Sequence, residues 1–543
     1  MRTMKFIIPA ALLLVVLVLS ITACHERIGK SKKVNLQVRE DALMEPAPPA
    51  GDLERAKIKG DTDREDQANF NREGYAHIEE NRFLAARQAP LSTFSIDVDA
   101  ASYTNVRRVI SQGGLPPAGA VRIEEMINYF DYKYPQPSGD EPFSVNTEMA
   151  ACPWNENHKL VLIGLQGREI QIDALPAANL VFLIDVSGSM DEPNKLPLVK
   201  SSLKMLTARL RDNDRVAIVV YAGNAGVVLP STSGKEKDKI REAVDRLEAG
   251  GSTAGGEGLM LAYKVARENF IKGGNNRIVL ATDGDFNVGP SSDDELVSLV
   301  EKERASGVYL SVLGVGFDNY QDGKMQQLAD KGNGNHYYID NINEARKVLV
   351  KEFGSTLFTI AKDVKIQVEL NPVKVQAYRL IGYENRVLAS EDFNDDKRDA
   401  GELGSGHRVT ALYEIIPAGI KDMWTVSVDT LKYQTQRTAV AGGYADEWMT
   451  IKLRYKRPDG EKSSLISRTL EDKARDAASD NLRWASAVAE FGLLLRNSAY
   501  KENSTWQQVV SLSKGARGPD EDGYRGEFIN LVETAEALAV AKK

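Results

Sequence analysis

Between residues 179 and 359, short uninterrupted apolar runs alternate with longer segments in which apolar residues recur every three to four positions. A run that is apolar throughout is typical of a strand buried on both faces of a parallel sheet, whereas the longer spacing is typical of a helix. Strands that alternate with helices predict a doubly wound, mostly parallel α/β sheet. The expected strands are residues 180–184, 215–221, 277–281 and 308–315, and the expected helices are residues 195–210, 235–247, 258–270 and 294–306.

The segments before and after this α/β region alternate apolar and polar residues at every second position, which is typical of antiparallel strands with one buried face. We expect a mixed α/β and β-sandwich-like region, built partly from segments on both sides of the α/β sheet, and a C-terminal helical extension. The expected strands are residues 94–98, 143–151, 160–165, 364–370, 375–381, 409–416 and 449–455, and the expected helices are residues 102–112, 121–130, 482–495 and 528–540.

The chain begins with the basic residues Arg2 and Lys5, an apolar run over residues 6–19 and small residues up to Cys24. This order is typical of a signal peptide, and the run is short for a membrane span, which needs about 20 apolar residues. Residues 21–23 before the cysteine resemble the lipobox of bacterial lipoproteins. The resemblance implies that Cys24 carries a lipid anchor, with palmitate among its acyl chains, and that the protein lies in the cell envelope.

The residue after the cysteine bears on the membrane that is expected. His25 differs from the aspartate that retains enterobacterial lipoproteins in the inner membrane, so the outer membrane is favoured. A transmembrane anchor and an ordinary secretory signal are the alternatives. From residue 25 to about residue 87 the chain is polar, charged and partly proline-rich, which predicts a disordered tether.

The length of 543 residues exceeds what one hydrophobic core supports, so several structural units are expected. A net charge of −8 gives no attraction for phosphate backbones, and nucleic acid is not an expected partner. Cys24 and Cys152 are the two cysteines, so lipidation of Cys24 leaves no pair for an intrachain disulfide, and Cys152 is interpreted as a small buried hydrophobe. The expected units are a signal peptide (1–23), a tether (24–88), an N-terminal α/β region (89–175), the α/β domain (176–360), a β-sandwich-like region (361–460) and the helical extension (461–543).

Hard oxygen donors follow the apolar strands of the α/β domain. A carboxylate and two hydroxyls stand at alternate positions after the strand at 180–184, a further hydroxyl lies in the glycine-rich loop 250–256, and a second carboxylate follows the strand at 277–281. Ligands of open α/β sheets bind at the carboxyl ends of strands, so these side chains are expected to converge on one spot. The residues are Asp185, Ser187, Ser189, Thr253 and Asp283.

In their order and spacing, these elements resemble the metal-ion-dependent adhesion site (MIDAS) of von Willebrand factor type A (VWA) domains. The resemblance covers about 180 residues and implies a VWA fold with a divalent-metal site. It implies direct ligation by Ser187, Ser189 and Thr253, with Asp185 and Asp283 holding the ion mainly through waters.

Oxygen ligation with retained waters suits Mg²⁺, with Mn²⁺ or Ca²⁺ as alternatives. The resemblance also implies a protein partner that offers an Asp or Glu carboxylate as the last ligand of the ion. Asp191, Asp285 and Asn287 lie near the motif and are expected to shape turns.

Outside the VWA segment, residues 92–103, 122–134 and 152–155 resemble a family of bacterial VWA lipoproteins of the YfbK type. That resemblance covers most of the expected mature chain. It implies an N-terminal region and a C-terminal extension of the family's own around the VWA domain, and it does not settle a molecular role.

Motifs of catalysis are missing from the sequence: the five histidines are scattered, and there is no Walker loop, nucleophile elbow or Rossmann fingerprint. We therefore expect a membrane-tethered, metal-dependent adhesion or assembly module rather than an enzyme. One alternative is a hydrolase or protease site in the flanking regions, for which the Asp97-Val98-Asp99 element offers a phosphatase-like candidate. The other is a structural scaffold whose metal site is occupied internally, for instance by the acidic loop 391–399.

Overall fold

The computed structural model describes residues 73–251, 255–284, 293–317, 320–352, 358–398, 400–425, 444–458, 460–471 and 477–541. The chain divides into two units, Met1–Ala68 and Asn69–Lys543, and the described residues belong to the second. The expected signal peptide, residues 24–72 of the expected tether (including Cys24) and Thr253 lie outside them, as do Asp285 and Asn287. Leu84 and Ala85 pair with the strand at residues 375–381, so the end of the expected tether is wrong, because these residues already belong to a sheet. Among the described helices, none combines the length and the apolar character that a membrane crossing requires.

The middle of the chain forms a six-stranded sheet in the order β10-β9-β8-β5-β6-β7. Its strands are parallel except for β7, which pairs antiparallel with β6 at one edge. Every residue of β5 is buried, as expected of a central strand with helices on both faces. The strands are β5 (Ala178–Asp185), β6 (Arg215–Tyr221), β7 (Ala225–Ser233), β8 (Asn275–Thr282), β9 (Val308–Val315) and β10 (His336–Ile339).

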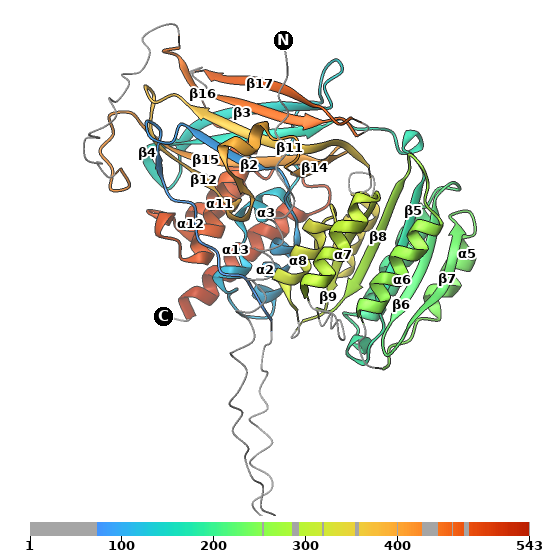
Figure 1. The fold of residues 1–543 in the computed structure, drawn as a ribbon. Helices are drawn as coiled ribbons and strands as arrows, with labels where there is room; N and C mark the ends of the chain where they lie inside the picture. The colour runs from blue at the N-terminus through green and yellow to red at the C-terminus, as the bar shows by residue number, and fades with distance from the viewer. Residues whose placement is uncertain are drawn as a thin grey trace, which may run out of the picture. The chain divides into compact units, whose positions relative to one another are not determined.

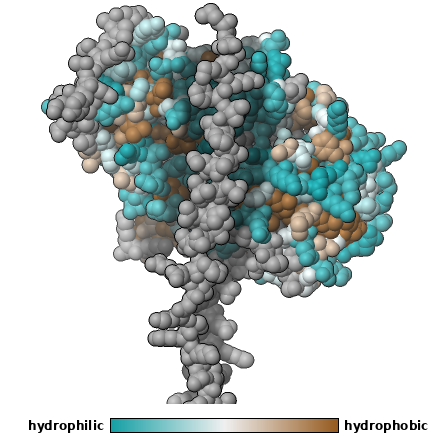
Figure 2. All heavy atoms as spheres, in the orientation of Figure 1, coloured by the Kyte–Doolittle hydropathy of each residue, from teal (hydrophilic) through white to brown (hydrophobic). Residues whose placement is uncertain are grey.

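Helices cover this sheet, and Figure 1 shows α6 and α7 across one of its faces. One apolar core joins α4 and α5 to the sheet and another joins α6, α7 and α8 to it, so the prediction of a doubly wound α/β domain is confirmed. Hydrophilic residues cover much of this domain on the face that Figure 2 shows. The helices are α4 (Leu196–Arg209), α5 (Lys237–Asp245), α6 (Gly255–Glu268), α7 (Asp293–Ala305), α8 (Asp322–Lys331) and α9 (Ile342–Arg346).

Two antiparallel sheets surround a further core and include strands from before and after the α/β domain. This confirms the expected β-sandwich-like region. One sheet has the order β1 (Leu84–Ala85), β12 (Val375–Ile381), β15 (Arg408–Pro417), β4 (Asn155–Gly167) and β3 (Phe143–Cys152). The other has the order β13 (Val387–Leu388), β2 (Leu91–Ser95), β11 (Thr359–Leu370), β16 (Glu447–Lys456) and β17 (Ser463–Glu471), with β14 (Gly401–Gly404) paired to β11.

Strand β17 corrects the expectation that the chain is helical beyond residue 461. It pairs with β16 along nine residues, from Ser463 to Glu471. Only Ile466 and Leu470 in it are buried, because it lies at the sheet edge. A strand with so few buried side chains leaves no apolar pattern in the sequence.

The expected C-terminal helices share a core with helices from the N-terminal region, and Figure 1 places α2, α11 and α13 together. The long helix α11 buries side chains around most of its circumference, which is typical of a helix inside a protein core. Cys152 is buried in the same core, in agreement with its interpretation as a small hydrophobe. The helices are α2 (Ala101–Ser111), α3 (Ile123–Asn128), α11 (Asp480–Arg496), α12 (Trp506–Gly515) and α13 (Tyr524–Ala541).

Arg107 on α2 connects three parts of the fold through ion pairs. Its guanidinium bonds Asp340 and Glu344 of the α/β domain, and it reaches Glu527 on α13 at 2.8 Å. The Arg107 side chain is 7% exposed, so most of these contacts are shielded from water. The α/β domain and the two flanking regions are therefore held together by a largely buried charge network.

Replacing Arg107 with methionine is expected to lower the free energy of unfolding by about 3–5 kcal/mol, because Asp340 and Glu344 stay buried without their cation. Arg468, which pairs with Glu141 at the surface, provides the control, and Arg468→Met should change stability by about 0.5 kcal/mol or less. Urea unfolding followed by circular dichroism measures both variants. Equal losses would contradict the role assigned to Arg107.

Candidate metal centre

The predicted site lies where β5 and β8 end side by side. The two strands pair in parallel up to Ile184 and Ala281, so the residues that follow them emerge at the same edge of the sheet. Gly188 N donates to Gly251 O at 3.1 Å, and Gly250 N donates to Val186 O at 2.7 Å, which holds the glycine-rich loop against the loop after β5. The structure thus brings together four of the five predicted residues, Asp185, Ser187, Ser189 and Asp283, and the fifth, Thr253, is not described.

Asp185 is fully buried and accepts three hydrogen bonds. Its Oδ1 accepts from Ser187 N at 2.9 Å, and its Oδ2 accepts from the Tyr221 hydroxyl at 3.1 Å and from Thr282 Oγ1 at 3.3 Å. Burial raises the pKa of Asp185 to about 6, although the hydrogen bonds from Ser187 oppose that shift. The carboxylate is therefore positioned, but its negative charge is only partly compensated.

The hydroxyls of Ser187 and Ser189 lie side by side, with 3.1 Å between their Oγ atoms. Two neighbouring ligands of an octahedral ion with metal–oxygen distances of about 2.0–2.1 Å lie about 3 Å apart. Each hydroxyl oxygen has two lone pairs, so the hydrogen bond between them leaves acceptor capacity for a cation. The spacing of this pair next to a buried carboxylate fits a small, hard divalent ion.

Asp283 is fully buried and pairs with a lysine that the sequence reasoning missed. The Lys195 ammonium lies 3.2 Å from Asp283 Oδ2 and 3.0 Å from Ser189 O. The sequence shows Lys195 only as the expected first residue of a helix, and its contact with Asp283 spans 88 positions. Tyr221 and Thr282, which bond Asp185, were missed for the same reason. Asp191, by contrast, is exposed at the end of a short turn.

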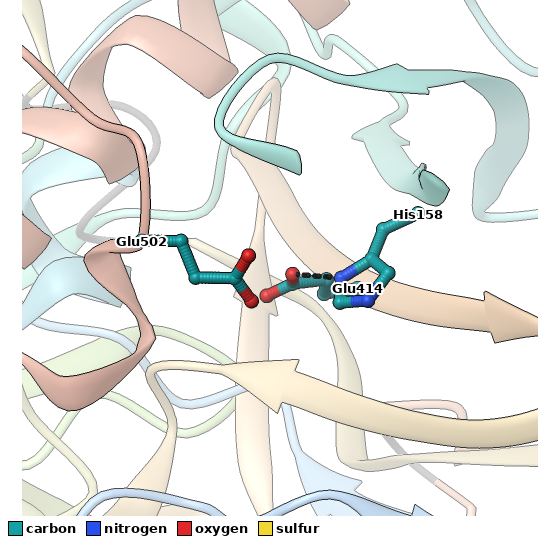
Figure 3. Close-up of side chains that lie close together, drawn as sticks. All are labelled: His158, Glu414 and Glu502. Atoms are coloured by element: carbon teal, nitrogen blue, oxygen red, sulfur yellow. Dashed lines mark hydrogen bonds and ion pairs between the residues drawn. The ribbon is translucent and has the colours of Figure 1, made fainter. Parts of the chain in front are cut away.

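A second cluster of titratable groups surrounds His158 on β4, and Figure 3 shows Glu414 and Glu502 near its ring. His158 Nδ1 lies 2.6 Å from Glu414 Oε1, and Nε2 lies 3.1 Å from Asp422 Oδ2. The far oxygen of Glu414 accepts from Arg379 at 2.7 Å. The histidines that look scattered in the sequence therefore include one with several carboxylates around it.

The His158 cluster is best interpreted as a buried charge network. Burial alone would lower the pKa of His158, but hydrogen bonds with Glu414 and Asp422 outweigh burial and raise it. Burial alone would raise the pKa of Glu414, but the guanidinium of Arg379 lowers it. Glu502 in turn accepts from Trp424 Nε1 at 3.0 Å. These carboxylates already have positively charged or hydrogen-bonding partners within the protein.

A cavity of about 1270 Å³ opens at the other end of the α/β sheet, where β5 and β8 begin, and it includes Asp97 and Asp99. Asp99 is buried and accepts from His336 N at 2.7 Å, and Arg386 lies 3.2 Å from Asp97. These aspartates therefore cap a strand and pair with arginine, which accounts for them without a phosphatase role. The cavity lies away from the ends of β5 and β8 that carry the metal-site residues.

Three family models match the chain: "von Willebrand factor type A domain" over residues 179–352, "Uncharacterized protein YfbK, C-terminal" over 355–538, and "von Willebrand factor" over 69–162. The chain is 46% identical to the uncharacterized protein YfbK of Escherichia coli (strain K12) over 478 residues, which covers 87% of this chain and 82% of that protein. It is 33% identical to the uncharacterized protein sll0103 of Synechocystis over 31% of this chain and 39% of that protein.

Among solved structures, a von Willebrand factor type A protein from Catenulispora acidiphila aligns over 69% of this chain and 87% of its own, at 15% identity and a TM-score of 0.39. The ArnB paralog VWA2 from Sulfolobus acidocaldarius aligns over 73% of this chain and 98% of its own, at 14% identity and a TM-score of 0.35.

The His158 network predicts a pH dependence of stability. Because the folded protein has a raised His158 pKa, its contribution is complete below the unfolded value of about 6.5 and is lost as pH rises through the folded pKa. The stability difference between wild type and His158→Gln should therefore shrink above about pH 6.5. Thermal unfolding from pH 6 to 9 measures it, with His77→Gln at an exposed histidine as control. A difference that is constant with pH would refute the charged His158.

Proposed function

The chain belongs to the YfbK family of von Willebrand factor type A proteins, and on this basis we propose that it is a metal-dependent protein-binding module. VWA domains generally mediate interactions between proteins. The single observation that carries the proposal is the pair of hydroxyls 3.1 Å apart beside the buried Asp185. Its position at the carboxyl ends of β5 and β8 is where open α/β sheets bind ligands.

In this proposal, Ser187, Ser189 and Thr253 hold Mg²⁺ directly, with Mn²⁺ or Ca²⁺ as alternatives. Asp185 and Asp283 act mainly through waters, and the bound ion supplies a positive site for a carboxylate of the partner. Tyr221 and Thr282 orient Asp185 by donating hydrogen bonds to its Oδ2 at 3.1 and 3.3 Å. Orientation of this kind by neighbouring groups commonly sets how well a metal site binds.

We propose binding rather than catalysis as the role of the whole chain. In the described part of the flanking regions, a cluster of buried titratable groups surrounds His158, and its acidic members are paired with basic or hydrogen-bonding groups. The described part of the acidic loop 391–399 packs on the β-sandwich-like region, where the carbonyls of Asp392 and Asp395 accept from Lys365 on β11. This placement argues against the loop as an internal ligand of the metal site.

We further propose that Cys24 carries a lipid that tethers the protein in the cell envelope, with the outer membrane favoured, for the reasons that the sequence at residues 21–25 provides. Such a tether favours binding to a partner on the same membrane, because attachment to a common surface raises the effective concentration of that partner. The partner itself is identified only by its carboxylate.

Metal binding should stabilise the protein, because a ligand that binds only the folded state contributes about 2.7 kcal/mol at 100 times its dissociation constant. Wild type should gain thermal stability with Mg²⁺ or Mn²⁺ and lose it with EDTA. The double variant Ser187→Ala, Thr253→Ala should show no gain, whereas Ser201→Ala, at an exposed serine on α4, should behave as wild type. An undiminished gain in the double variant would remove the proposed site.

Lipidation should be visible in fractionated cells. Wild type is expected in the membrane fraction with its signal peptide removed, and Cys24→Ala is expected to leave that fraction or to keep the precursor mass. Cys152→Ala is the matched control, because Cys152 lies in a core and should not affect the anchor. Immunoblotting and intact-mass measurement report both properties. If Cys24→Ala is processed and membrane-bound as wild type is, the anchor lies elsewhere.

A further inference from the structure

Lys195 is a buried lysine at the centre of the proposed metal site. It directly precedes α4 and is 3% exposed, although lysine side chains are seldom fully buried unless they are paired. Its ammonium contacts both loops that carry the site, at 3.0 Å from Ser189 O and 3.2 Å from Asp283 Oδ2. The lysine is therefore part of the site and not of the solvated surface.

The backbone after β9 holds the stem of this lysine in place. Gly316 has a positive φ of 74°, and a Cβ on it would lie 2.5 Å from Lys195 Cε, so the lysine stem takes the space that a side chain would fill. The carbonyl of Gly316 accepts from the Tyr338 hydroxyl, which fixes that segment in turn. On the other side, Lys195 N donates to Glu192 O at 2.9 Å. The ammonium is thus presented to Asp283 from a defined direction.

The charge balance of the site follows from this arrangement. Asp185 and Asp283 are both fully buried, and the ammonium of Lys195 compensates the second of them. A carboxylate that already bonds an ammonium attracts a divalent ion less strongly, and one of its oxygens is engaged. Fewer negative charges close to an ion leave it more attractive to an external carboxylate.

We propose that Lys195 is a positioning residue that keeps Asp283 from ligating the ion directly, so that the ion is held less tightly and stays receptive to a carboxylate of the partner. This inference rests on the proposed function, since it concerns the same site. It assigns to Lys195 two opposite effects. The lysine lowers the affinity for the divalent ion, and it raises the affinity of the loaded site for carboxylate.

The test uses the full chain, purified in detergent, with Mn²⁺ as the metal and acetate as the carboxylate probe. Lys195→Met removes the charge, and Lys195→Gln removes it but keeps a donor for Asp283, in case the methionine variant does not fold. Lys204→Met on α4, where the lysine pairs with Asp245 at the surface, is the matched control for lost charge. Electron paramagnetic resonance of free Mn²⁺ measures the affinity for the metal. Water-proton relaxation by the bound Mn²⁺ measures how much acetate is needed to displace its bound water.

Both Lys195 variants are expected to bind Mn²⁺ at least about tenfold more tightly than wild type. They are also expected to need about tenfold more acetate than wild type to displace water from the bound Mn²⁺. Lys204→Met should match wild type. Mn²⁺ affinity in the folded Lys195 variants that equals or falls below that of wild type would overturn the inference. The proposed function would survive that result if wild type binds Mn²⁺ and Ser187→Ala does not. No Mn²⁺ binding by wild type would overturn both.

Discussion

Asp185 and Asp283 are fully buried carboxylates at the ends of two adjacent parallel strands, β5 and β8. Charge buried in this way is unfavourable unless hydrogen bonds or opposite charges compensate it. Hydrogen bonds from Ser187, Tyr221 and Thr282 stabilise the carboxylate of Asp185, and the ammonium of Lys195 stabilises that of Asp283. A divalent ion beside these two buried carboxylates would add positive charge where Asp185 has hydrogen bonds and Asp283 has one ammonium, which is why a cation is expected to stabilise this edge of the sheet.

The same requirement joins distant segments of the chain. Arg122, before α3, pairs with Asp322 on α8, much as Arg107 on α2 pairs with Glu344 on α9. Both pairs link the α/β domain to the region before it, and His158 and Glu414 link strands from either side of that domain. The flanking segments are therefore more than a linker, because they form one sandwich-like core and one helical core around contacts with the α/β domain. The edge that carries the metal site belongs to a domain fixed at several points.

Local features of the sequence predicted the site better than the contacts around it. Asp185, Ser187 and Ser189 lie within five positions, and uninterrupted apolar runs mark the strands β5 and β8 that bring Asp283 to them. Lys195 and His158 could not be predicted, because their partners lie 88 and 256 positions away and are brought near by the fold alone. The edge strands β7 and β17 escaped prediction because few of their side chains are buried. Whether Thr253 completes the site stays a prediction, since it is not described.

The central claim is that recognition runs through the metal site and not through the flanking regions. Crosslinking in cells, with recovery of the proteins attached to the chain, tests it most directly when wild type is compared with wild type in EDTA and with Asp185→Ala. Asp185 is the last residue of β5, and its carboxylate bonds the polar groups of Ser187, Tyr221 and Thr282 instead of packing in an apolar core, so its loss opens no cavity in a hydrophobic core. The account predicts a partner that is recovered from wild type and lost in both other samples. Recovery of the same partner in equal amount from all three would contradict it.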